Sequence, residues 1–200
     1  MKKLGAILCI SGGLLLSVSA VSCKDSLQDG TSNSSPELTN SVDETDTIYE
    51  ASTTVKEHKN ADAVVMAYLT LKNTLMESES ESSKKIARKL IIAFKQFDVK
   101  SFSSEEQKEL KDILEDAIEQ TTHISGSKLV HQREHFVAVS EDVLELIAIA
   151  GTTKTLYQDF CPMFNDGKGA VWISETKAIK NPYFGAGKML GCGSIQEVIN

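Results

Sequence analysis

The sequence lacks the short motifs that mark the common catalytic sites. It contains no phosphate-binding loop, no His-Glu-x-x-His segment, no paired CxxC and no recognisable Ser, His, Asp arrangement. Its two C-terminal cysteines, Cys161 and Cys192, lie far too distant in the chain to form a thioredoxin motif. We therefore predict that the protein is not an enzyme.

Positive charge is also scarce. The 200 residues include 21 Lys and Arg against 28 Asp and Glu, which gives a net charge of −7 at pH 7. Removal of an N-terminal segment containing Lys2 and Lys3 would leave 19 basic residues, and a net charge of about −9. Such an acidic chain is a poor partner for nucleic acid, and a basic patch would not supply membrane affinity.

A hydrophobic run long enough to span a membrane comfortably is missing as well. The apolar run from Leu4 to Leu16 follows the two lysines and leads into small residues, which is the order of an export signal. The stretch Ser19-Ala20-Val21-Ser22-Cys23 resembles a bacterial lipoprotein signal, with alanine where leucine is usual. We predict that residues 1–22 are a lipoprotein signal peptide. Lipidation of Cys23 would anchor the protein to a bacterial membrane of the cell envelope, with the outer membrane favoured.

The segment that follows cannot bury a core. Residues 23–59 are rich in Ser, Thr, Asn, Asp and Glu, and their apolar residues show no sustained period. We predict a disordered tether over 23–59 and one folded domain over 60–200.

Apolar residues recur at helical spacing in the first part of this domain. A first helix is expected from about Asn60 to Met76, followed by a polar turn over 78–83 and a second helix that ends near Asp98. Ser103 stands three residues before Glu106, as in a capping box, and predicts the start of a third helix.

The loop Ser125-Gly126-Ser127 should end the third helix, and a fourth should run from Lys128 to Ala150 with Gly151 as its C-terminal cap. Four helices with short connections predict a mainly α fold, an antiparallel four-helix bundle. The fourth helix is expected to bury Leu129, Phe136, Val143, Leu144 and Ile147.

The pattern changes after Gly151. Two β-prone runs, 155–160 and 170–174, flank a turn-rich loop and predict a small β-hairpin. Beyond it, Asn181-Pro182 and several glycines predict an irregular C-terminal segment. Residues 194–199 are expected to form a final turn of helix.

Several stretches of this C-terminal part are recognisable. They are Tyr157–Met163, 167–172, 179–185, Met189-Leu190 and Cys192-Gly193, together with 132–136 and Ser140-Glu141 on the fourth helix. They resemble an uncharacterised family found in exported lipoproteins of Bacteroidetes-type bacteria and at the C-terminal end of some periplasmic adaptors of heavy-metal efflux pumps. The resemblance spans roughly 61–198. It implies a helical bundle and an association with copper or related metals, but no demonstrated activity. Metal-efflux or other envelope proteins are the partners that we expect. Phe164 and an inserted Gly187 depart from the family pattern.

Sulfur atoms are concentrated near the C-terminus. Two thiols, Cys161 and Cys192, and two thioethers, Met163 and Met189, are the soft ligands that Cu(I) prefers. Cys161 and Met163 would point to the same side of an extended segment, whereas Met189 and Cys192 would share a face only if their stretch coils as a helical turn. The sequence thus predicts a site for a soft metal ion, most plausibly Cu(I), provided that the two pairs meet.

A disulfide is the nearly equal alternative for the same cysteines. In an oxidising compartment, Cys161 and Cys192 would more simply staple the C-terminal segment to the domain. Both hypotheses require adjacent sulfur atoms, and they can describe two redox states of one site.

Histidines offer a weaker metal signal. His131 and His135 lie four residues apart on the fourth helix and could chelate a metal together, with Glu134 or Glu141 nearby. Ordinary surface positions are the simpler interpretation for His131, His123 and His58. His135 stays a candidate ligand for the sulfur site because it lies within the Arg-Glu-His-Phe segment of the family resemblance.

Two functions follow from these patterns. The first is a lipid-anchored envelope domain that binds Cu(I) or another soft metal as an accessory to metal handling or efflux. The second is a non-catalytic envelope scaffold or protein-binding module in which Cys161 and Cys192 form a structural disulfide.

Overall fold

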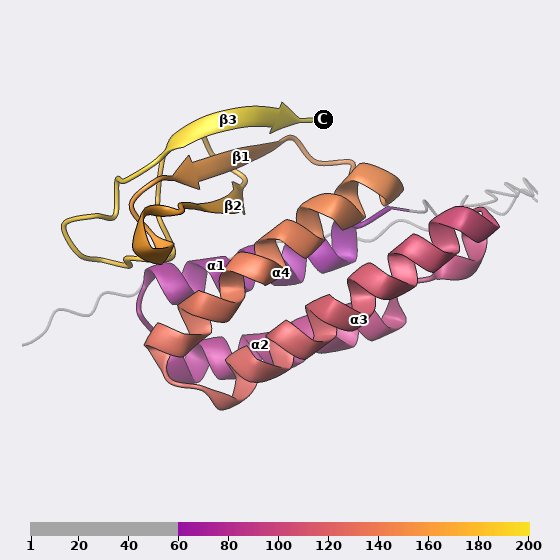
Figure 1. Cartoon of the computed structure of the whole chain (residues 1–200), viewed down its shortest axis with the longest axis horizontal. Coiled ribbons are helices and arrows are strands. Elements are labelled where there is room, and N and C mark those ends of the chain that lie inside the picture. Colours follow the sequence, from indigo (N-terminus) through magenta and orange to yellow (C-terminus); the bar gives the residue numbers. More distant parts are fainter. Residues whose placement is uncertain (1–59) are drawn as a thin grey trace, which may run out of the picture. The chain divides into compact units, whose positions relative to one another are not determined.

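A computed structural model describes residues 60–200 (Figure 1). The predicted signal peptide, the predicted lipidation site at Cys23 and the predicted tether, including His58, lie outside these residues. The four helices are α1 (Asp62–Met76), α2 (Ser80–Gln96), α3 (Ser104–Gly126) and α4 (Leu129–Ala150). They form an antiparallel bundle, which confirms the predicted mainly α fold.

The capping box of α3 is present as predicted. The Ser103 hydroxyl accepts a hydrogen bond from the Glu106 backbone N–H at 3.3 Å, and the Glu106 carboxylate accepts one from the Ser103 backbone N–H at 2.8 Å. This pairing satisfies two backbone donors that would otherwise lack partners at the start of the helix. A short 3₁₀ turn, η1 (Val99–Ser101), connects α2 to this cap.

The connection between α1 and α2 is shorter than predicted. Residues 78–83 were expected to be a turn, but α2 already begins at Ser80. Ser78 takes a left-handed φ of 64°, which lets the chain reverse in a few residues. Ser83 is buried, and its hydroxyl bonds to the Glu79 carbonyl and the Thr74 hydroxyl, both at 2.9 Å. These hydrogen bonds satisfy the buried Ser83 hydroxyl, so the polar residues at the start of α2 can be helical and packed against the bundle.

The core lies between the four helices and continues under the sheet. Its largest fully buried side chains come from every helix and from two strands. Leu129 and Leu144 were expected in this core, but both are only partly buried and pack at its edge. The position of α4 against α1 and α3 instead buries Leu146 completely. Further core side chains include Tyr68, Phe94, Leu110, Ile124, Phe136, Leu156 and Trp172.

The predicted hairpin is confirmed as part of a larger sheet. Strands β1 (Leu156–Cys161) and β2 (Ala170–Ser174) pair antiparallel, with Cys161 opposite Ala170 and Tyr157 opposite Ser174. The connecting loop contains a 3₁₀ turn, η2 (Asn165–Gly167). Figure 1 shows the sheet lying over α1 and α4, on the side away from α2 and α3.

A third strand replaces the predicted C-terminal turn of helix. Residues Ser194–Ile199 form β3, which pairs antiparallel with β1 and gives the strand order β2-β1-β3. The apolar residues of this segment have a helix-like spacing, but the free edge of β1 offers a row of unpaired backbone groups. Pairing with that edge decides the local structure, with a β-bulge between Gln158 and Asp159.

Within residues 60–200, no helix combines the length and apolar character needed to cross a membrane.

Candidate functional site

The two cysteines of the predicted metal site are joined by a disulfide. Their Cα atoms lie 5.7 Å apart, Cys161 is completely buried, and Cys192 is partly buried. The fold therefore brings together two cysteines that are 31 positions apart in the sequence, as both hypotheses required. In this oxidised state neither sulfur is available as a thiolate ligand.

The two methionines lie in different surroundings. Strand β1 ends at Cys161 and the chain turns immediately, so the predicted extended segment through Met163 is wrong. The Met163 side chain is 62% exposed, unlike the buried Cys161. Met189 is partly buried, and its carbonyl accepts a hydrogen bond from the Cys192 N–H at 2.9 Å, which closes a turn from Met189 to Cys192.

Asn181 organises the segment that carries Cys192. This buried side chain donates to the Cys192 carbonyl at 2.8 Å and accepts from the Tyr183 N–H at 2.8 Å. Its backbone N–H also donates to the Leu190 carbonyl at 2.8 Å. The recognisable Asn-Pro-Tyr-Phe stretch thus holds the C-terminal loop in place.

Arg133 ties the same stretch to the bundle. Its guanidinium donates to the Pro182 carbonyl at 2.9 Å, to the Leu75 carbonyl at 2.8 Å and to the Ser78 hydroxyl at 3.0 Å. Burial lowers the pKa of Arg133 from its ordinary value. Gly185 has a φ of 63°, and a Cβ there would collide with the guanidinium. The arginine and the glycine are therefore structural partners.

A buried hydroxyl network joins the sheet to the helices. The Tyr68 hydroxyl lies 2.8 Å from the Ser140 hydroxyl and accepts from the Ile173 N–H at 3.1 Å. The Tyr183 hydroxyl lies 3.3 Å from the same serine and donates to the Val171 carbonyl. Burial raises the pKa of both tyrosines, so both stay protonated and available as donors.

His135 does not join the sulfur atoms in a cluster. Its Nδ1 lies 2.7 Å from the Gln120 amide oxygen and its Nε2 lies 3.0 Å from Nε2 of His131. The His123 ring stacks on it at a centroid distance of 4.5 Å. Burial, His131 and His123 lower the pKa of His135, although Glu134 opposes them. His123 and His131 were expected at ordinary surface positions, and His135 was a candidate for the sulfur site. The three rings instead contact one another where α3 packs on α4.

No set of three His, Cys, Asp or Glu side chains within residues 60–200 is placed to hold a metal ion.

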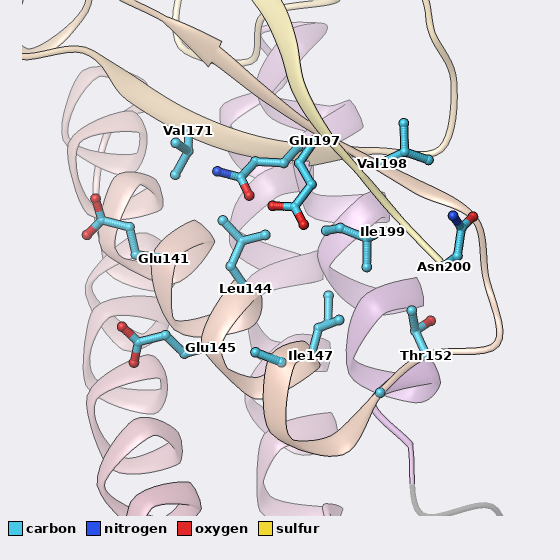
Figure 2. Close-up of a pocket in the computed structure, with 13 residues that line it drawn as sticks. Glu141, Leu144, Glu145, Ile147, Thr152, Val171, Glu197, Val198, Ile199 and Asn200 are labelled. Atoms are coloured by element: carbon cyan, nitrogen blue, oxygen red, sulfur yellow. The ribbon is translucent and has the colours of Figure 1, made fainter.

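An open groove of about 890 Å³ lies between α4 and the sheet (Figure 2). Apolar side chains from both sides line it, and Leu144 lies near its centre in the close-up. Three carboxylates also line it: Glu141 and Glu145 from α4, and Glu197 from β3, whose side chain points toward the helix in Figure 2. The apolar lining includes Leu144, Ile147, Val171, Val198 and Ile199.

Carboxylates are concentrated in the groove and beside it on α4. Burial and the nearby Glu145 raise the pKa of Glu141. Asp142, next to the groove-lining Glu141, is 8% exposed, and its pKa is raised to about 7 by burial and by Asp116, Glu145 and Glu141. Among residues 60–200, no Lys or Arg lines the groove. The arrangement favours a cationic ligand with an apolar part.

Sequence reasoning missed the groove. Glu141 was considered only within the family resemblance and as a neighbour of the His131 and His135 pair, and Glu197 lay in the segment expected to be helical. No local signal pairs Glu197 with α4, because their proximity depends on β3 joining the sheet. The partial exposure of Leu144 follows from the same arrangement.

The fold and the disulfide define a small helical-bundle domain with a stapled antiparallel sheet. Residues 64–155 match the model of DUF3347, a family described as a protein of unknown function. A DUF3347 domain is therefore present at these residues. The match covers the bundle from α1 through α4 and ends at the edge of β1. The recognisable stretches after Tyr157 lie beyond it. No curated protein and no solved structure matches the chain.

Proposed function

We propose that the protein is a non-catalytic binding module of the bacterial cell envelope, anchored through lipid on Cys23. The groove between α4 and the sheet holds an extended basic segment of an envelope protein. The observation that carries this proposal is the combination of three carboxylates with an apolar lining in one open groove. Basic groups would pair with the carboxylates while alternate apolar side chains contact the lining.

The position of β3 supports an extended ligand. β3 lines the groove and lies at one edge of the three-stranded sheet, where its outer side has no neighbouring strand among the described residues. An extended segment can add main-chain hydrogen bonds to such an edge, and its alternate side chains then reach the groove.

The C-terminal motifs support a structural use of the cysteines. Cys161 and Cys192 form the disulfide, and Asn181 and Arg133 fix the loop that carries Cys192. These contacts hold the end of the chain that continues into β3. In this proposal, these four residues hold β3 in the position that forms the groove, and they do not contact the ligand.

Binding of model peptides tests the proposal. A labelled peptide that alternates lysine and valine should bind the full chain, whereas its glutamate and valine counterpart should not. The double variant Glu145→Gln, Glu197→Gln should weaken binding by about tenfold, and added salt should weaken binding of the wild-type protein.

Matched substitutions provide the control. Glu105→Gln, Glu109→Gln removes the same charge from exposed positions on α3 and should leave the affinity unchanged. If both double variants lose affinity equally, the peptide responds to net charge and the groove is not its site.

Soft-metal binding is a second candidate, favoured by the adjacency of Cys161 and Cys192. Reduction of the disulfide would present two thiolates side by side, with Met189 in the adjoining turn, and Cu(I) prefers such ligands. The protein would then serve metal handling or efflux. The reduced protein should compete with a mild Cu(I) chelator, and Cys161→Ser should abolish most of that competition. Equal competition by the oxidised protein would show that the cysteines are not the ligands.

A further inference from the structure

The histidines between α3 and α4 have a hydrogen-bonding arrangement that two neutral rings do not satisfy. Nε2 of His131 and Nε2 of His135 face each other at 3.0 Å, and the two rings are nearly perpendicular at 89°. Each of these nitrogen atoms carries either a proton or a lone pair. The partners of the opposite ring nitrogens decide which it is.

The Gln120 amide fixes the tautomer of His135. Gln120 donates from its Nε2 to the Asp116 carboxylate at 3.2 Å, which places its amide oxygen toward the histidine. That oxygen lies 2.7 Å from Nδ1 of His135 and can only accept, so Nδ1 carries the proton. In the neutral ring, Nε2 of His135 therefore has a free lone pair.

Glu134 fixes the tautomer of His131 in the same way. Its carboxylate oxygen lies 2.6 Å from Nδ1 of His131 and accepts the proton of that nitrogen. In the neutral ring, Nε2 of His131 has a free lone pair as well. Two neutral rings would thus place two lone pairs 3.0 Å apart, which is repulsive unless a proton or a metal ion lies between them.

We propose that His131 and His135 form a binding site for a divalent transition-metal ion of the Zn²⁺, Ni²⁺ or Cu²⁺ class, held by the two Nε2 atoms. Imidazole nitrogen is a preferred ligand of these ions. With metal to nitrogen bonds of about 2.05 Å, two neighbouring ligands lie roughly 2.9 to 3.4 Å apart, which includes the observed distance. Water completes the coordination, because only two of these side chains converge.

The surroundings have the form that metal-bound histidines usually show. In such sites the second ring nitrogen donates to a carboxylate or carbonyl oxygen, which orients the ring. Glu134 serves His131 and Gln120 serves His135 in this role, and the His123 ring supports His135 by stacking. Asp116, through Gln120, extends the chain of contacts to a further carboxylate.

This site is independent of the groove and of the sulfur atoms. It is formed by α3 and α4 alone, and the disulfide can stay closed while the ion binds. If no metal ion binds to these histidines, the proposed function of the groove is not affected.

Metal titration of the oxidised full chain tests the proposal. After chelator treatment, ZnCl₂ should bind at one equivalent by calorimetry, and the Nε2 resonances of His131 and His135 should shift together in ¹⁵N NMR spectra. His131→Ala and His135→Ala should each weaken binding at least tenfold, on the order expected when a metal site is disturbed. His131 is exposed, so its alanine variant should fold normally.

The supporting residues give a sharper test. Glu134→Ala removes the acceptor of the His131 proton without removing a ligand, and it should weaken Zn²⁺ binding by about tenfold. Glu119→Ala, which removes an exposed carboxylate on α3, is the matched control and should bind as wild type. Unchanged affinity in His131→Ala would overturn the proposal. So would NMR spectra in which the two rings share a proton and no Zn²⁺, Ni²⁺ or Cu²⁺ binds at about millimolar concentration.

Discussion

At the scale of single residues, polar side chains in this domain are buried for two different reasons. Asn181 and Arg133 satisfy backbone groups of the C-terminal loop and hold it to the bundle. Asp142 and Asp159 instead retain buried carboxylate oxygens without a hydrogen-bond partner among the described residues. Burial raises the pKa of Asp159 to about 6, although the charge of Lys72 opposes the shift. Buried carboxylates without hydrogen-bond partners cost stability when they ionise.

Asp142 should make the domain less stable as the pH rises. Its pKa in the folded state is raised to about 7 from an ordinary 3.8, so folding favours the protonated form. That contribution is complete below pH 3.8 and is lost as the pH rises through about 7. Asp142→Asn should increase the free energy of unfolding at pH 8 by on the order of 1 to 2 kcal/mol, and by little at pH 4. Urea unfolding at both pH values measures this difference. Asp112→Asn, at an exposed position on α3, is the control. Equal effects of the two variants at pH 8 would contradict the prediction.

Leucines two positions apart on α4 should differ in their contribution to stability. Leu146 is completely buried, whereas Leu144 is partly exposed in the groove. Leu146→Ala should therefore lower the free energy of unfolding by about 2 to 5 kcal/mol, and Leu144→Ala by clearly less. Thermal and urea unfolding of both variants provide the measurement. A larger loss for Leu144→Ala would show that the groove is closed in solution.

At the scale of elements, local sequence predicts the helices better than the strands. The Ser103 capping box and Gly151 mark helix ends through contacts a few residues apart, so both positions could be predicted. β3 could not, because its structure depends on the free edge of β1, far away in the chain. The adjacency of Cys161 and Cys192 was predicted as a condition of either hypothesis, but the turn after Cys161 that exposes Met163 was not.

The C-terminal segment should loosen when Asn181 is replaced. Asn181→Ala leaves the Cys192 carbonyl and the Tyr183 N–H without their partner in a buried region, which should cost about 1 to 3 kcal/mol. The loop around residues 186–191 should then be cut faster by protease, while the disulfide retains the fragment. Gln96→Ala, an exposed position at the end of α2, should change neither quantity. An unaltered cleavage rate in Asn181→Ala would mean that the disulfide alone fixes the loop.

At the scale of the whole molecule, the sheet converts a helical bundle into a domain with a groove. Bundle patterning alone could not reveal this, because α4 contributes one wall and the sheet contributes the other. Glu145 and Glu197 are 52 positions apart in the chain and meet only through β3. The histidine cluster is similar, since His123 and His135 are brought together by the packing of α3 on α4. Charge and sulfur content could be read from sequence, but the placement of the acidic groups required the fold.

NMR mapping of the peptide site tests the central proposal most directly. The ¹⁵N-labelled full chain would be titrated with the lysine and valine peptide, and backbone shifts would be assigned. We expect the largest changes at Leu144, Gln158 and Ile199, which line the groove, with little change at the far side of the bundle around Ile92. Saturable shifts confined to the groove, lost in the Glu145→Gln, Glu197→Gln variant, are the predicted result. Shifts spread over the acidic surface, or centred away from the groove, would contradict the account.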